Sequence, residues 1–183
     1  MEVVLEHIQG VMTVQLNVYG DDRGFFVERF SERAFREAGL PTTFCQDNHS
    51  RSKPGVVRGL HYQTGPVQGK LVGVIRGRIW DVVVDIRPNS PTFGAHLSAE
   101  LTGEGGRLLW IPPGLAHGFC VVGDEPADVL YKVDRPYNRE TEGGILWSDL
   151  ELDIKWPVER PTVSDRDRQL QTFAQYKANP HRW

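Results

Sequence analysis

The chain of 183 residues is 39% hydrophobic and 25% charged, a balance typical of one globular domain, which we expect to span residues 1–183. A chain of this length removes roughly 70% of its unfolded surface from water, so its core needs no metal or disulfide. The sequence has no run near the ~18 uncharged apolar residues of a membrane helix, no signal-peptide pattern at residues 1–10, and a net charge of −3. We therefore expect a cytoplasmic protein whose partners include no membrane and no nucleic acid.

Most of the chain has the pattern of short β-strands. Apolar or alternating runs rich in Val, Ile, Phe and Trp recur between turn residues, with a first turn at residues 20–24. In chain order, the predicted strands are residues 11–18, 25–30, 42–46, 56–63, 71–75, 78–86, 96–101, 107–111, 118–122 and 129–133.

Only residues 31–38 predict a clear helix, with Ser31 as the N-cap and Gly39 at the C-terminal stop. The other connections are too short for the crossover helices of a parallel sheet. Eight or more antiparallel strands of this length fit a jelly roll, so we predict an all-β protein with a few short helices. After Pro157 the strand pattern fades, and residues 161–173 are predicted to be a polar tail that packs back across the body.

Charge and cysteine usage give two further predictions. Residues 51–80 contain six basic residues and no acidic residue. This stretch is either a binding surface for a small polyanion or a surface that acids elsewhere neutralise, and charge alone does not decide between these. Cys45 and Cys120 lack zinc-like spacing and are predicted to be buried small hydrophobic residues in a reducing environment.

The segment 57–63 is the most informative part of the sequence. In a strand His61 and Gln63 face one side, whereas Arg58 faces the other. A β-bulge at Gly59 would turn both Arg58 and His61 toward one site, as bulges beside active sites often do. We therefore predict a bulge at Gly59.

A second segment, residues 110–119, bears on whether the protein binds a metal ion. The turn that ends at His117 has the PxGxxH spacing by which cupin jelly rolls supply a metal ligand, and it sets His117 at the start of a strand. In the first segment, however, Gln63 stands in place of an imidazole. Lys70, which we expect beside His61 across a hairpin, places a cation where a carboxylate is needed. Metal ligands must be neutral or anionic, so we predict no metal.

The same residues suit the removal of a proton next to a ketone. Histidine, with an ordinary pKa of about 6.5, is the natural base, and Lys70 would stabilise the enolate oxygen. Tyr131 would return a proton to the opposite face if it lies across the substrate from His61, although strand aromatics more often serve packing. The histidine also needs an orienting carboxylate, for which the sequence leaves three candidates: Asp167, Asp81 and Asp85.

Nine short motifs follow one another along nearly the whole chain. They are DDRGFFVE (21–28), QDNHS (46–50), VRGLHYQ (57–63), GK (69–70), DVVVDIR (81–87), SPTFG (90–94), WIPPGLAHGF (110–119), LYK (130–132) and the tail at 164–167. In this order they resemble the dTDP-4-dehydrorhamnose 3,5-epimerases, cupin-fold enzymes of dTDP-L-rhamnose synthesis. The resemblance implies a cupin-type double-stranded β-helix (jelly roll) with no metal and no cofactor.

The resemblance also implies a reaction, the inversion of C3 and C5 of dTDP-4-dehydro-6-deoxy-D-glucose to give dTDP-4-dehydro-L-rhamnose. In it, His61 is the base paired with Asp167, Tyr131 is the acid, and Lys70 stabilises the enolate at the C4 oxygen. The implied substrate-binding residues are Arg23, Phe26, Glu28, Gln46, Asp47, Asn48, Arg58, Lys70, His117, Tyr137 (stacked on the thymine ring), Glu142 and Arg166.

The resemblance implies a homodimer as well, because in this family the strand that carries Arg23, Phe26 and Glu28 is exchanged between subunits. Arg166 stands where many members have lysine, which keeps the charge but changes the donor geometry. The closing residues 175–183 match no pattern, and the sequence predicts no role for them.

Other functions remain open on the sequence alone. Related enzymes act at one carbon, and the presence of His61 and Tyr131 does not exclude a single-site (3- or 5-) epimerase. A metal-dependent cupin and a non-catalytic nucleotide-sugar binding module are alternatives from other classes. Activity that survives a chelator contradicts the first of these, and exchange of substrate protons with heavy water contradicts the second.

Overall fold

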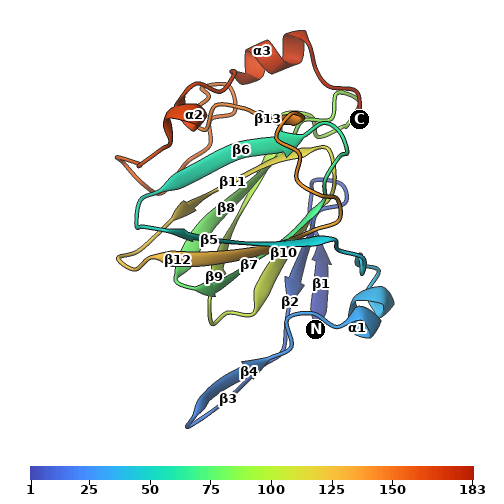
Figure 1. Cartoon of the computed structure of the whole chain (residues 1–183), viewed down its shortest axis with the longest axis vertical. Coiled ribbons are helices and arrows are strands. Elements are labelled where there is room, and N and C mark those ends of the chain that lie inside the picture. Colours follow the sequence, from blue (N-terminus) through green and yellow to red (C-terminus); the bar gives the residue numbers. More distant parts are fainter.

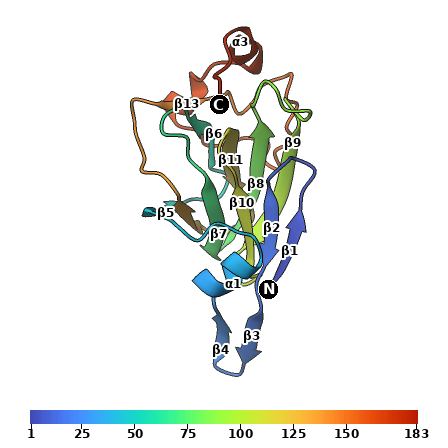
Figure 2. The ribbon, with the colours of Figure 1, turned by 90° about the vertical axis from the view of Figure 1, so that its right-hand side faces the viewer.

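The computed structural model describes residues 1–183 as two antiparallel β-sheets packed face to face (Figures 1 and 2). The six-stranded sheet contains, in spatial order, β1 (Glu2–Leu5), β2 (Met12–Gln15), β10 (Arg107–Ile111), β7 (Lys70–Arg76), β12 (Ala127–Val133) and β5 (Gln46–Ser52). The five-stranded sheet contains β13 (Glu142–Gly144), β6 (Val57–Gln63), β11 (Leu115–Val121), β8 (Arg78–Asp85) and β9 (His96–Thr102). The predicted all-β jelly roll is confirmed.

The space between the sheets holds the largest apolar cluster, of 14 buried residues. Val72 and Val129 enter it from the six-stranded sheet, and Ile79 and Val83 enter it from the five-stranded sheet. Because side chains alternate along a strand, the neighbours of Val83 face outward, where a second cluster covers them. Both faces of β8 are therefore buried, which explains its nearly continuous apolar sequence.

Three short helices lie outside the sheets: α1 (Glu32–Glu37), α2 (Asp165–Arg168) and α3 (Phe173–Ala178). Helix α1 confirms the helix predicted after Ser31, although the Ser31 side chain makes no capping hydrogen bond. The tail at residues 161–173 packs back across the five-stranded sheet as predicted, but it contains α2 and leads into α3, and the sequence pattern revealed neither helix (Figure 1). No helix is long and apolar enough to cross a membrane.

A two-stranded hairpin of β3 (Val18–Asp21) and β4 (Gly24–Val27) extends away from the sandwich (Figures 1 and 2). It exposes aromatic side chains, of which Tyr19 is 62% and Phe26 is 68% exposed. The predicted strand 11–18 is therefore divided, since β2 ends at Gln15 and Val18 begins the hairpin. Exposed apolar groups that gather on one projecting element are typical of a surface that meets another molecule.

Several predicted boundaries are wrong. The strand expected at residues 42–46 instead begins at Gln46 and runs to Ser52, because this edge strand is polar and alternation of apolar residues does not detect it. The short edge strand β13, with the sequence EGG, was not predicted for a similar reason, and β1, which has only four residues, was also not predicted. His117 is the third residue of β11 rather than its first. Cys120 is buried as predicted, but Cys45 is exposed.

Candidate active site

A cavity of about 380 Å³ lies between the two sheets, and polar side chains from both sheets line it. Because β5, β7 and β12 are in one sheet and β6 and β11 in the other, residues distant in sequence face the same space. Ten of the lining residues are polar or ionisable groups suited to binding or catalysis: Gln46, Asn48, Ser50, Lys70 and Tyr131 from the six-stranded sheet, Arg58, His61, His117 and Glu142 from the five-stranded sheet, and Tyr137 from the segment before β13.

The predicted irregularity at Gly59 is present in β6. His61 pairs with His117 and Arg58 pairs with Phe119, so β6 has one more residue than β11 between these two positions. Gly59 has φ +117°, and a Cβ there would lie 2.6 Å from the Cα of Gly118. This bulge brings both Arg58 and His61 to the cavity, as the sequence predicted.

Of the three carboxylates that the sequence left open, Asp167 is the one bonded to His61. Its Oδ1 lies 2.8 Å from Nε2 of the imidazole, and its Oδ2 accepts the backbone N–H of Gly59 at 3.2 Å. Ser164 caps α2 by accepting the backbone N–H of Asp167, which fixes the carboxylate in the first helical turn. Burial acts to raise the pKa of Asp167, but the hydrogen bonds from His61 and Gly59 outweigh it and lower the pKa.

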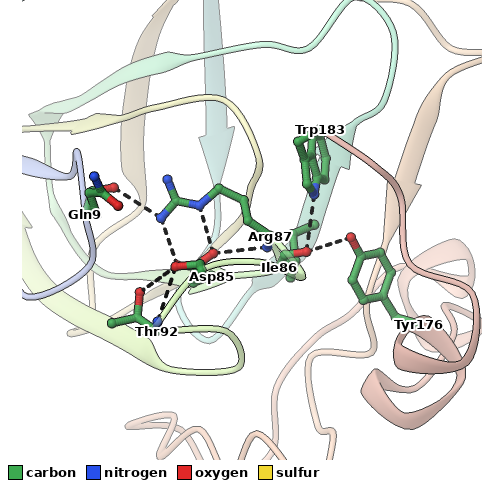
Figure 3. Close-up of polar contacts among 8 residues, drawn as sticks. Gln9, Asp85, Ile86, Arg87, Thr92, Tyr176 and Trp183 are labelled. Carbon is green, nitrogen blue, oxygen red and sulfur yellow. Dashed lines mark hydrogen bonds and ion pairs between the residues drawn. The ribbon is translucent and has the colours of Figure 1, made fainter.

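The other two carboxylates have different partners. Oδ2 of the buried Asp81 lies 2.8 Å from Nε2 of His117, and its Oδ1 has no hydrogen-bond partner. Asp85 binds the guanidinium of Arg87 and the hydroxyl of Thr92 on the loop after β8 (Figure 3). No group of three or more His, Cys, Asp or Glu side chains that could hold a metal ion is found.

Lys70 and Tyr131 reach the cavity from the sheet opposite His61. The prediction of a hairpin between Lys70 and His61 is wrong, because β6 and β7 lie in different sheets and the loop between them crosses the sandwich. Both side chains nevertheless line one cavity, as expected. Burial lowers the pKa of Lys70 to about 8 despite the nearby negative charge of Glu142, and burial raises the pKa of Tyr131.

A network at the rim joins residues from three segments. The hydroxyl of Tyr137 donates to Oε2 of Glu142 at 2.8 Å, and Arg166 forms an ion pair with the same oxygen. The backbone N–H of Tyr137 donates to Oε1 of Gln46 at 3.1 Å. The Tyr137 ring is 48% exposed, so one face of an aromatic ring remains available at the cavity mouth.

Five predicted binding residues do not line this cavity, and one of them is Arg166 on α2, which reaches the rim only through its ion pair with Glu142. Arg23, Phe26 and Glu28 belong to the projecting hairpin and the residue just after it, and Arg23 forms an exposed ion pair with Asp21. Asp47 lies between Gln46 and Asn48 in β5, so strand alternation turns it to the opposite side, where Lys132 binds it at 2.9 Å. Within one chain, none of these five side chains lines the cavity.

Some lining residues were not predicted. Ser50 shares the cavity side of β5 with Gln46 and Asn48, and the period of two from those residues would have identified it. The Oγ of Ser50 is buried without a partner. Gln68 and Phe119 also line the cavity, and no sequence signal marked them.

Both interpretations of the basic stretch 51–80 hold in part: some of its cations face a possible anion site, and others are neutralised by acidic residues elsewhere. Arg58 and Lys70 line the cavity. Arg51, Arg76 and Arg78 instead form ion pairs with acidic residues of later segments, which are Asp128, Glu125 and Glu100. The sixth cation, Lys53, is exposed and does not line the cavity, so only two of the six cations are available to an anion there.

Similarity in sequence and in fold to known proteins identifies the family. The family model for dTDP-4-dehydrorhamnose 3,5-epimerase matches residues 6–175. The enzymes of that name from Shigella flexneri and Pseudomonas aeruginosa are 50% identical over 175 and 169 residues, which cover 94% and 91% of this chain and 96% and 93% of theirs. The crystal structure of a Legionella pneumophila dTDP-6-deoxy-D-glucose-3,5-epimerase in complex with dTDP-4-keto-L-rhamnose is 41% identical, superposes with a TM-score of 0.93, and covers 100% of this chain and 98% of that one.

The fold and these relatives define an isomerase of the jelly-roll epimerase class. More particularly, the chain belongs to the dTDP-4-dehydrorhamnose 3,5-epimerase family.

Proposed function

We propose that this protein inverts C3 and C5 of dTDP-4-dehydro-6-deoxy-D-glucose and thereby forms dTDP-4-dehydro-L-rhamnose for dTDP-L-rhamnose synthesis. Family membership supports this substrate. The observation that carries the proposal is the His61–Asp167 pair on one wall of a cavity whose opposite wall holds Tyr131 and Lys70. A base and an acid on opposite sides of a ring are what an inversion requires.

Each inversion consists of two proton transfers. His61 binds Asp167 through Nε2, so its Nδ1 is the nitrogen that takes the proton from the carbon beside the ketone. The electrons of the broken C–H bond form an enolate, and the ammonium group of Lys70 stabilises the charge on the C4 oxygen. The Tyr131 hydroxyl then protonates the same carbon from the other face. Exchange with water returns His61 to its neutral form and restores the Tyr131 hydroxyl, so no net proton is consumed.

The nucleotide part of the substrate is proposed to bind at the rim. Tyr137 offers an aromatic face for the thymine ring, and Arg58 and Arg166 supply positive charge for the diphosphate. The exposed hairpin supports a homodimer in which Arg23, Phe26 and Glu28 of the partner subunit complete this site. That arrangement accounts for the absence of these side chains from the cavity of their own chain.

Proton exchange in heavy water tests the function directly. With the 4-keto sugar nucleotide as substrate, we expect NMR to show loss of the signals of both the C3 and the C5 protons, with unchanged rates after treatment with a chelator. Exchange at only one carbon would identify a single-site epimerase. Binding without exchange at either carbon would identify a binding module and contradict the proposal.

A further inference from the structure

The ring of Tyr62 lies directly against the backbone of β13. Tyr62 on β6 is paired in register with Gly143, and a Cβ built on Gly143 would lie 2.5 Å from two ring carbons of Tyr62. Any side chain at this position would push the strand away from the ring. Glycine on an edge strand next to a cross-strand aromatic ring therefore lets β13 lie flat on that ring.

The closing segment of the chain also packs against the Tyr62 ring. The rings of Tyr176 and Trp183 meet the Tyr62 ring edge to face, with centroids 5.6 Å and 6.0 Å away. Tyr176 and Trp183 also donate to one carbonyl, that of Ile86, at 2.8 Å and 3.2 Å, as Figure 3 shows. Two independent donors on one fixed acceptor orient both rings, and so they define the position of the Tyr62 ring.

Strand β13, which lies against Tyr62, contributes Glu142 to the rim of the cavity. Glu142 directly precedes Gly143, and its carboxylate binds both the Tyr137 hydroxyl and Arg166. A shift of β13 therefore moves the acceptor that joins an aromatic side chain to a cation at the mouth. His61 pairs in register with Gly144 of β13, but its imidazole is held by Asp167 of α2, and Lys70 and Tyr131 belong to the opposite sheet.

We propose that Trp183 and Tyr62 are positioning residues for nucleotide binding. The closing segment presses the Tyr62 ring against Gly143, and this contact sets the height of β13 and so the place of Glu142 with its two partners. The inference gives a role to residues 175–183 and rests on the proposed function for the identity of the ligand. It predicts an effect on substrate binding that is separate from the chemical step.

The test compares binding and turnover in three single variants. In Trp183→Ala we expect dTDP affinity, measured by calorimetry, to weaken about fivefold and KM to rise equally, with kcat for proton exchange within about twofold of wild type. Trp183→Phe keeps a ring against Tyr62 and should recover most of the affinity. Arg182→Ala, at the exposed neighbouring position, should bind dTDP like wild type.

Gly143→Ala provides a second route to the same displacement. It should raise KM without lowering kcat, and in combination with Trp183→Ala it should add less than its separate effect, because both changes act on one contact. Thermal unfolding and circular dichroism verify that each variant is folded. A parallel fall in kcat and thermal stability with unchanged dTDP affinity would mean that Trp183 is merely structural and would overturn the inference.

The outcomes for the two proposals are distinguishable. Wild-type protein that binds dTDP but exchanges no protons contradicts the proposed function, and the binding comparison still decides the role of Trp183. Normal exchange by wild type, with unchanged dTDP affinity in both Trp183→Ala and Gly143→Ala, contradicts only the inference about the closing segment.

Discussion

Nε2 of His61 lies 2.8 Å from Oδ1 of Asp167, although 106 positions separate the two residues in the chain. The carboxylate is nearly covered, with 6% of its side chain exposed, whereas 26% of the imidazole is exposed. One imidazole nitrogen of His61 is therefore bonded to an ordered, shielded carboxylate, and the other nitrogen is free to accept a proton. General-base catalysis requires this arrangement.

Asp167→Asn tests this pairing. The amide has nearly the same shape but cannot stabilise the imidazolium, so we expect kcat for exchange at both carbons to fall at least about 100-fold with little change in dTDP affinity. Asp165→Asn, on the exposed face of the same short helix, serves as the control and should retain full activity. Equal rates in the two variants would contradict a role for Asp167 in orienting the base.

The two proton-transfer groups should have different phenotypes. We expect His61→Ala to abolish exchange at both C3 and C5. Tyr131→Phe should retain appreciable exchange and yet form little correctly inverted product, because the base remains when the acid is lost. NMR of the sugar in heavy water measures both quantities, and His96→Ala on β9 is a matched control. Normal product formation by Tyr131→Phe would exclude it as the acid.

The pKa of Lys70, which lines the cavity, predicts how activity changes at alkaline pH. Its pKa of about 8 means that the Lys70 cation is lost as the pH rises through that value, so kcat should decline above pH 8. Lys70→Met should lower kcat about 100-fold and abolish this alkaline decline. An unchanged decline in that variant would assign it to another group.

The same pKa predicts a trend in stability. The folded-state pKa of Lys70 lies below its ordinary value, so between these two values the unfolded chain binds more protons than the folded chain. The cost of burying the charge is thus fully present below pH 8 and diminishes at higher pH. The free energy of unfolding, measured by denaturant titration, should therefore rise with pH above about 8 in the wild type, and this rise should be absent from Lys70→Met.

The close approach of β6 and β11 predicts the effect of Gly59→Ala. A Cβ at this position collides with the Gly118 backbone, so we expect a loss of about 2–4 kcal/mol in stability and a loss of proton exchange as the bulge shifts. Gly123→Ala isolates the backbone part of the cost, since Gly123 also has positive φ but has nothing within 4 Å of an added Cβ. It should cost only about 1 kcal/mol.

The projecting hairpin predicts how the subunits associate. Phe26 is 68% exposed, and a charge there should disfavour a dimer built by strand exchange. We expect Phe26→Glu to run as a monomer in light-scattering chromatography and to have a KM raised about tenfold. Leu150→Glu, at a position that is 95% exposed on another part of the surface, should behave like wild type in both measurements. A dimeric Phe26→Glu would contradict the exchanged arrangement.

The apolar strands could be predicted from the sequence, whereas the polar parts of the site were predicted unevenly. Burial on both faces made residues 78–86 unmistakable. In contrast, β5 places amides and a serine toward a cavity, so its alternation contains no apolar signal and its boundaries were missed. The bulge at Gly59 was predictable because glycine permits a positive φ that other residues rarely adopt.

Long-range pairing could not be derived from local pattern. On local pattern Asp167, Asp81 and Asp85 were equivalent as partners for His61, and only the family resemblance indicated Asp167. The tertiary structure pairs the first with His61, the second with His117 and the third with Arg87. The cytoplasmic location, the homodimer and the single-domain boundaries remain predictions.

The proposed base and the proposed acid belong to opposite sheets, so the thickness of the apolar layer between the sheets sets the gap that a sugar ring must fill. Packed interiors are barely compressible. A methylene gained or lost at Val72 or Val83, which lie in the apolar layer and pair in register with Tyr131 and His117, would therefore alter how closely each ring carbon approaches its donor and acceptor. Substitutions in the apolar layer between the sheets should therefore change which carbon is inverted. Variants with a repacked layer could invert one of the two carbons and leave the other unchanged.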